Sequence, residues 1–129
     1  MGDEKVDNKN REEFIFENLE VYKQALEFSV EIAKEASKFP IKFQRIRDQI
    51  IGASISIPLN IAEGNGRGSS KEKINFYKIA RASSFECIPL LVICEELELF
   101  SEEQSTKYRM TVAKISRMIS GLISYQKAR

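Results

Sequence analysis

Histidine is absent from the sequence, which removes the residue that most often acts as a general base or binds a transition metal. Cysteine occurs only at Cys87 and Cys94, and no CxxC pair provides the ligand spacing of a zinc site. The phosphate-binding motif GxxxxGK[ST] and the hydrolase motifs GxSxG and HExxH are missing as well. The sequence therefore predicts a protein that is not an enzyme and that holds no cofactor or metal.

Long apolar runs are also missing. The most apolar stretch, residues 50–62, is broken by Gly, Ser, Pro and Asn and is too short to cross a bilayer. Residues 1–11 are charged and lack the hydrophobic region of a secretory signal. The two cysteines lie in one expected helix, about 10 Å apart along its axis, which is too far for a disulfide. We thus expect a cytoplasmic protein without membrane contact, whose thiols are reduced and lie in the core.

Apolar residues recur at spacings of three and four along most of the chain, which indicates amphipathic helices. The length of 129 residues suits one domain. The expected parts are a mobile tail over residues 1–16 and a bundle over residues 17–127, with helices over 18–37, 42–64, 69–99 and 101–126. The first helix carries a main apolar row of Leu19, Tyr22, Leu26, Ser29, Ala33 and Ala36, widened by a second row of Val21, Ala25, Phe28 and Ile32.

Short connections between these helices favour antiparallel neighbours, so the expected fold is all-α, an up-down-up-down antiparallel four-helix bundle. The glycines of residues 64–68 predict a turn, and Ser69 and Ser101 predict the caps of the helices that follow. Pro58 and Pro89 fall inside helices, where proline removes a backbone donor. We expect a kink at each proline, or a short break at Pro58.

The second helix is apolar nearly all round between residues 50 and 62. Such a helix is buried on more than one side. One side meets the core of the bundle, and another subunit is the simplest cover for the other. The predicted oligomer interface consists of Ile51, Ile55, Pro58 and Ala62.

Charge is distributed in blocks although the net charge is only +1. Residues 83–104 hold six acids and no Lys or Arg, whereas residues 105–129 hold six Lys or Arg and no acid. One interpretation is that acidic and basic helices pair across their edges. The other is a basic surface for nucleic acid or an acidic partner. Its candidate residues are Lys107, Arg109, Lys114 and Arg117, together with Arg67, Lys71 and Lys73.

Several polar residues on the apolar rows have alternative interpretations. Asn60 suits a buried amide that fixes the register of the bundle, or a ligand contact. Glu63 and Glu86 are expected to pair with Arg67, Arg81 or a neighbouring subunit rather than to act in catalysis. Four tyrosines could stack on bases, although their helical spacing favours core or edge positions; they are Tyr22, Tyr77, Tyr108 and Tyr125.

The string QIIGASISIPLNIAEG (residues 49–64), the following GRGS and the segment IARASSFE (residues 79–86) carry a family resemblance. They resemble the four-helix-bundle proteins encoded in intervening sequences of bacterial large-subunit ribosomal RNA genes. The family's motif falls here on Asn60, Glu63, Gly64, Ser83 and Glu86. The resemblance implies a homo-oligomer, a pentamer ring, and a link to the related accessory proteins of diversity-generating retroelements.

Two functional hypotheses follow. The first is a non-enzymatic, homo-oligomeric adaptor, linked to rRNA intervening sequences, that binds RNA or a nucleoprotein through basic helix surfaces. The alternative is a self-assembling module that docks a protein, such as a reverse transcriptase, without binding nucleic acid directly. Fold alone does not separate these two functions.

Overall fold

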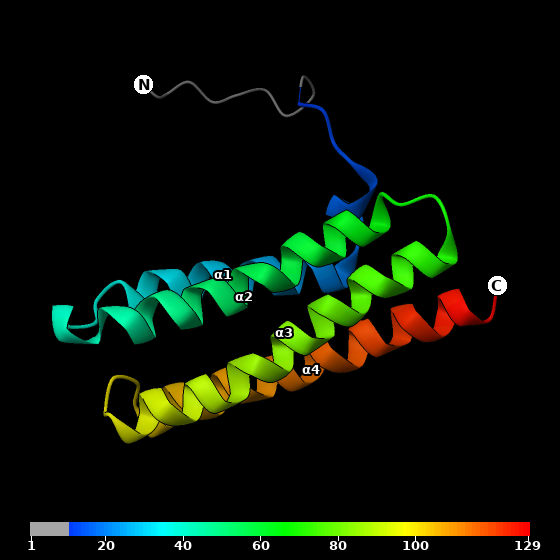
Figure 1. The fold of residues 1–129 in the computed structure, drawn as a ribbon. Helices are drawn as coiled ribbons and strands as arrows, with labels where there is room; N and C mark the ends of the chain where they lie inside the picture. The colour runs from blue at the N-terminus through cyan, green and yellow to red at the C-terminus, as the bar shows by residue number, and fades with distance from the viewer. Residues whose placement is uncertain (1–10) are drawn as a thin grey trace.

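The structure, a computed structural model, describes residues 11–129, and all regular secondary structure in this part is helical. The elements are η2 (Ile15–Asn18), α1 (Glu20–Ala36), η3 (Ile41–Phe43), α2 (Gln44–Asn65), α3 (Ser70–Glu96) and α4 (Glu102–Lys127). The four α-helices alternate in direction along the bundle, which confirms the expected up-down-up-down fold (Figure 1). Around the bundle, α1 packs on α2, α2 on α3 and α3 on α4, while α1 and α4 touch least.

Both predicted caps are present. The side chains of Ser69 and Ser101 accept backbone hydrogen bonds in the first turns of α3 and α4. The end of α3 differs from the prediction, because the helix stops at Glu96 and Glu98 adopts the left-handed conformation with a φ of 60°. The backbone N–H of Leu99 then donates to the carbonyl of Cys94 at 2.8 Å, which closes the helix end.

The core side of α1 corrects the sequence interpretation. The second row, of Val21, Ala25, Phe28 and Ile32, is buried throughout, whereas Leu26 of the expected main row is 42% exposed. Phe28 points across the bundle to Tyr108, with ring centroids 6.1 Å apart. The large side chains of the second row fill the space between helices, and Ser29 and Ala36 of the expected main row are buried beside them.

The other helices bury the rows that their periodicity predicts. Ile50 and Ile57 of α2, Cys87 and Cys94 of α3 and Ile115 of α4 are fully buried. Both cysteines are free thiols, and burial raises the pKa of Cys87 to about 12 and that of Cys94 to about 11. The thiols therefore stay protonated at neutral pH and behave as small apolar core groups.

Aromatic rings close the end of the bundle where two interhelical connections meet. The ring of Phe100, after α3, lies 5.2 Å from Phe39 and 5.3 Å from Tyr108, in edge-to-face arrangements. At the other end, Phe16 of η2 packs edge-on against Tyr22 at 4.9 Å. The tail predicted for residues 1–16 lies mostly outside the described residues. Its last residue, Phe16, packs on Tyr22 of the bundle.

The two prolines do not interrupt their helices. α2 continues through Pro58 to Asn65, and α3 continues through Pro89 to Glu96, so the short break expected at Pro58 is wrong. Pro58 is buried inside the chain, where packing offsets the lost hydrogen bond. A kink at each proline stays a prediction.

Candidate functional site

The helix α4 carries the longest basic segment of the chain. After Glu102 and Glu103 in its first turn, α4 has no acidic residue. Its buried face consists of Ser105, Tyr108, Val112, Ile115, Ser116, Ile119 and Ile123. The cations therefore project from the remaining faces, toward solvent or toward the edges of α1 and α3.

Helical periodicity divides these cations into two directions. Lys107 and Lys114 lie seven residues apart, so their side chains leave α4 on the same side, and Arg117 follows one turn later. Arg109 points roughly 140° away from Lys114, since each residue turns an α-helix by about 100°. We name Lys107, Lys114 and Arg117 the α4 basic row. Arg109 lies outside it.

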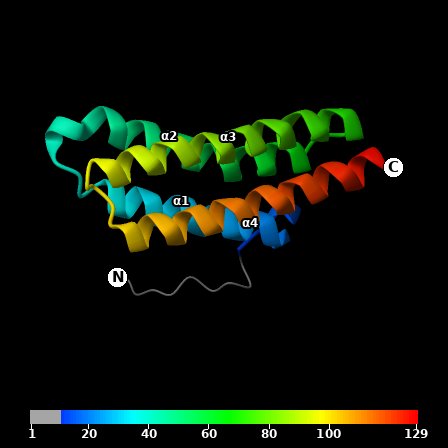
Figure 2. The ribbon, with the colours of Figure 1, turned by 90° about the horizontal axis from the view of Figure 1, so that it is seen from below.

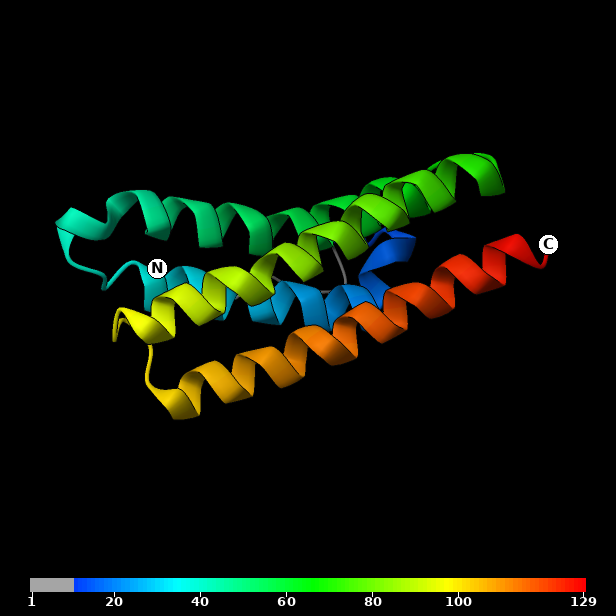
Figure 3. The ribbon, with the colours of Figure 1, turned by 60° about the horizontal axis from the view of Figure 1, so that its bottom comes forward.

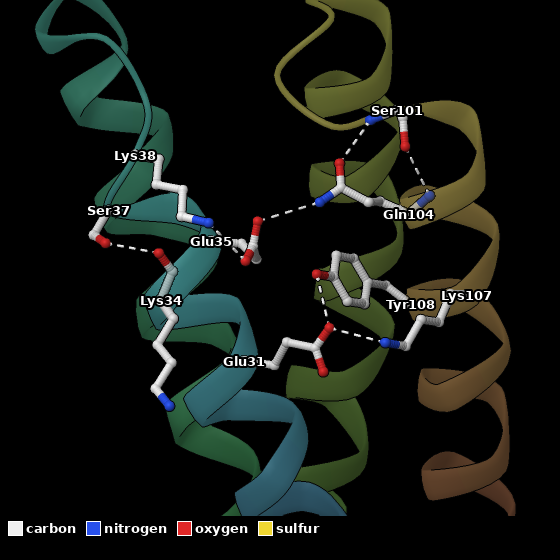
Figure 4. A network of polar contacts seen from close by, with 9 residues as sticks. All are labelled: Glu31, Lys34, Glu35, Ser37, Lys38, Ser101, Gln104, Lys107 and Tyr108. Atoms are coloured by element: carbon white, nitrogen blue, oxygen red, sulfur yellow. Dashed lines mark hydrogen bonds and ion pairs between the residues drawn. The ribbon is translucent and has the colours of Figure 1, made fainter.

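Lys107 is engaged with the acidic helix α1 (Figure 4). Its Nζ lies 3.0 Å from Oε2 of Glu31, and the hydroxyl of Tyr108 donates to the same oxygen at 3.1 Å. One turn away, the amide of Gln104 donates to Glu35 at 3.3 Å. Burial first, and then the charge of Glu31, raise the pKa of Tyr108. At this position acidic and basic helices pair across their edges, as the first interpretation of the charge blocks expected.

Lys114 and Arg117 are exposed, as Lys107 is, but neither forms an ion pair within residues 11–129. Arg109 is exposed and unpaired within the same part of the chain. Among the candidate cations of α4, these three therefore keep their charges available to a partner.

The other predicted cations surround the turn between α2 and α3. Arg67 binds Glu63, with 2.6 Å between Nη2 and Oε2, and its guanidinium lies 4.7 Å from the ring centroid of Phe76. Lys73 donates from Nζ to the backbone oxygen of Asn65 at 2.7 Å. Only Lys71 is exposed without such a contact in the described residues. Arg67 and Lys73 thus stabilise the turn itself.

The seven candidate cations do not form one surface. Ser70, at the start of α3, donates to the side chain of Gln126 at 2.8 Å, so the α2–α3 turn lies beside the C-terminal end of α4. Lys107 precedes Gln126 by five helical turns, a separation of about 28 Å along the axis. Lys107 and Arg109 therefore lie toward the end of α4 away from this turn, whereas Lys114 and Arg117 lie between the two ends.

Two of the five motif residues, Gly64 and Ser83, lie where α2 contacts α3. The amide of Asn60 donates to the carbonyl and the hydroxyl of Ser56, at 2.8 and 3.0 Å. The hydroxyl oxygens of Ser56 and Ser83 lie 2.7 Å apart across the two helices. Asn60 is half-buried and joins this contact only through Ser56 of its own helix, so its role in fixing the register stays a prediction. Glu86 is exposed and forms no ion pair within residues 11–129.

Gly64 allows the closest approach of the two helices. A Cβ added there would lie 2.8 Å from Cε1 of Tyr77 and 3.0 Å from Cβ of Phe76, which is too short for any side chain. Burial of Tyr77 raises the pKa of its hydroxyl. Glycine is therefore required at the end of α2 by packing within the chain.

The predicted oligomer residues are only partly exposed. Pro58 is buried, Ile51 and Ala62 are half-buried, and Ile55 is 38% exposed. A larger apolar surface, which we name the outer α2–α3 face, consists of Ile55, Leu59, Ile79 and Ile93. Leu59 follows Ser56 by one turn and Ile79 precedes Ser83 by one turn, so both flank the Ser56–Ser83 contact on its outer side.

Sequence reasoning missed most of this face because it attributed the exposed apolar surface to α2 alone. The available signal was the apolar character of α3 on all sides between Ile79 and Ile93, which resembles that of α2.

Comparison with known proteins identifies the family. The sequence pattern of the 23S rRNA-intervening sequence protein family matches residues 17–121, which is most of the chain. The chain belongs to this family. Among solved structures, this 23S rRNA-intervening sequence protein is similar to the crystal structure of a protein with unknown function from the S23 ribosomal protein family of Bacteroides thetaiotaomicron. The two structures align with a TM-score of 0.73 and 26% sequence identity. The alignment covers 80% of this chain and 97% of the other.

No curated protein sequence matches significantly. Within residues 11–129 of this 23S rRNA-intervening sequence protein, no helix has the length and apolarity to cross a membrane. In the same residues, no three His, Cys, Asp or Glu side chains gather where they could bind a metal ion.

Proposed function

We propose that this 23S rRNA-intervening sequence protein is a non-enzymatic, homo-oligomeric adaptor that binds RNA. The placement of two unlike surfaces on opposite sides of the bundle supports it. The outer α2–α3 face is apolar, and the α4 basic row faces the side of α1 and α4. Because the helices follow one another around the bundle, these two sides are opposite. Copies joined through the first surface would leave the second accessible.

The apolar surface supports self-association. Leu59 is 63% exposed and Ile79 47% exposed, on adjacent helices. Gly52, also on the outer side of α2, has no atom within 4 Å of an added Cβ, so another helix could approach the backbone there. Contiguous exposed apolar surface of this kind usually marks an interaction site. The resemblance to the family favours five copies in a ring.

The free cations support RNA as the ligand. Lys114, Arg117 and Arg109 are exposed on a segment that contains no acid to compete for them. Lysine and arginine bind phosphate groups, and an oligomer repeats such contacts along a polyanion. The affinity should therefore fall steeply as the salt concentration rises.

Charge reversal tests the RNA interface. We expect Lys114→Glu/Arg117→Glu to reduce the affinity for a labelled single-stranded RNA at least tenfold in an anisotropy titration and to flatten its salt dependence. The matched control is Lys42→Glu/Arg45→Glu, which makes the same charge change at exposed positions around the start of α2. Equal loss in both variants would reject the α4 basic row in favour of a general charge effect.

Light scattering tests the oligomer. The wild-type mass should be a multiple of the 14.8 kDa chain, five times for a pentamer, and Leu59→Glu/Ile79→Glu should reduce it. Met110→Glu is the control, because Met110 is 69% exposed on α4, away from the outer α2–α3 face. A wild-type monomer at micromolar concentration contradicts the proposal.

The alternative function is a module that assembles and docks a protein without binding nucleic acid directly. One observation favours it: Lys107 and Arg67, two of the expected RNA contacts, are paired with acids of the same chain. Salt-insensitive or absent RNA binding by an intact oligomer would support this alternative.

A further inference from the structure

The C-terminal end of α4 exposes an aromatic side chain that the bundle does not use. Tyr125 is 60% exposed, whereas Tyr77 and Tyr108 are each 2% exposed. The guanidinium of Arg129 lies 5.6 Å from the ring centroid of Tyr125. A tyrosine at helical spacing ordinarily packs in the core or at the edge between two helices, and Tyr125 packs in neither place. Its open ring and neighbouring cation are the components of a stacking site for a base.

Gly121 lies one turn before Tyr125 and has no structural purpose within the described residues. It is exposed two turns before the end of α4, and a Cβ added there would meet no atom within 4 Å. Glycine is one of the poorest helix formers, so the position weakens α4 without any packing reason of the kind seen at Gly64. A glycine at such a position leaves the helix backbone open to the close approach of a ligand.

The geometry of α4 joins these residues to the basic row. Tyr125 follows Lys107 by 18 residues, which is five full turns, so both side chains leave α4 in the same direction. Gly121 is seven residues after Lys114, and Arg117 is one turn before Gly121. Cations, an open backbone and an aromatic ring therefore follow one another along one side of the helix.

Within residues 11–129, this side is uncovered at its C-terminal end. The polar contacts between α1 and α4 involve Glu31 and Glu35 with Gln104, Lys107 and Tyr108, all near the start of α4. The red end of α4 extends beyond the start of α1 in both turned views (Figures 2 and 3). A strand lying along α4 would meet Tyr125 without displacing α1.

We infer that Tyr125, with Gly121, Arg117 and Arg129, is a stacking site for an unpaired base, which makes single-stranded RNA the preferred ligand of α4. This inference rests on the proposed RNA-binding function. In a duplex the bases stack on one another inside the helix, so only a single strand can place a base on the ring while its phosphates meet Arg117 and Arg129. Because base stacking tolerates any sequence, we expect little sequence preference.

Two RNAs and three variants test the inference on the full-length protein. Anisotropy titrations compare a single-stranded RNA with a double-stranded RNA of equal length. Tyr125→Ala should weaken single-strand binding about tenfold and leave duplex binding within about twofold. Tyr125→Phe should retain the wild-type affinity, because the ring rather than the hydroxyl stacks. Ile41→Ala removes an exposed apolar side chain of η3, at the other end of the bundle, and should change neither affinity.

A second measurement locates the base directly. Irradiation of the complex with single-stranded RNA containing 4-thiouridine should attach the RNA to the peptide that contains Tyr125. Gly121→Gln should reduce this cross-link while raising the helix content seen by circular dichroism. Salt-sensitive RNA binding that Tyr125→Ala leaves unchanged, with cross-links only elsewhere, would overturn the stacking site and leave the proposed function standing. Absence of salt-sensitive binding to both RNAs would reject both.

Discussion

The α2–α3 pair and the α1–α4 pair hold the bundle together by different means. α2 and α3 approach closely at Gly64 and are linked by the hydroxyls of Ser56 and Ser83. α1 and α4 touch least of the neighbouring helices, and their polar contacts centre on Glu31 and Tyr108. The first pair is fixed by shape, and the second by charge and hydrogen bonds at one end.

The difference suggests a division of roles within the bundle. Close helix packing tolerates few changes, because an added methyl group has no space to enter. A polar contact at the edge is weaker and can be exchanged with solvent or ligand. The α2–α3 pair can thus be rigid and present the outer α2–α3 face. The α1–α4 side of the same bundle is less tightly packed and presents the cations of α4.

The largest effect is expected from filling the close contact. Gly64→Ala should lower the free energy of unfolding by about 2 kcal/mol, because the new Cβ would overlap the ring of Tyr77. Urea unfolding followed by circular dichroism measures the change. Gly52→Ala is the matched control, since its Cβ meets nothing, and it should instead stabilise α2 by about 0.5–1 kcal/mol. Similar effects at the two glycines would contradict the shape-fixed interface.

A smaller effect is expected at the polar end of α1 and α4. Glu31→Ala should cost about 1 kcal/mol, because it removes the acceptor of the Tyr108 hydroxyl as well as the partner of Lys107. The Lys107–Glu31 ion pair is partly exposed, and Lys107→Ala should cost less than about 0.5 kcal/mol. Unfolding in low and high salt separates the two contributions, since only the ion pair is screened. A loss for Glu31→Ala as large as that for Gly64→Ala would erase the contrast between the two pairs.

Local signals in the sequence predicted much of the fold. The periodicity of Ile50 and Ile57, and the caps at Ser69 and Ser101, depend on residues within a few turns of one another. The sequence did not decide which of two adjacent apolar rows of α1 faces inward, because that depends on the neighbouring helices. It also did not predict the left-handed conformation at Glu98, a position where glycine is the usual residue.

The candidate site was less predictable, because it depends on contacts between distant parts of the chain. Lys107 and Glu31 are 76 residues apart in sequence, and only the fold brings them together. Arg67 and Glu63 are one turn apart, and their pairing could be predicted from sequence alone. The solvent exposure of Tyr125 follows from the extension of α4 beyond α1, which no local pattern encodes.

The smallest effect is the pH dependence of the stability that Tyr108 contributes. It is also the effect most diagnostic of the α1–α4 contact. In the folded protein burial and Glu31 raise the pKa of Tyr108 above its usual value of 10.0, which the unfolded chain retains. Above pH 10 the unfolded state loses this proton while the folded state keeps it, so stability falls as the pH rises. Below pH 10 both states are protonated and this contribution to stability does not depend on pH.

The effect of Tyr108→Phe on the free energy of unfolding therefore changes sign with pH. At pH 8 the variant should be less stable by about 0.5–1 kcal/mol, because the hydrogen bond to Glu31 is lost. Above pH 10 the difference should shrink and then reverse, because phenylalanine has no proton to lose in the unfolded chain. Urea unfolding of both proteins across this range measures the difference, and the ionisation of Tyr77, Cys87 and Cys94 cancels because both proteins contain them. A constant difference at all pH values would mean that Tyr108 is neither buried nor bound to Glu31 in solution, and that the α1–α4 pair is more open than the structure has it.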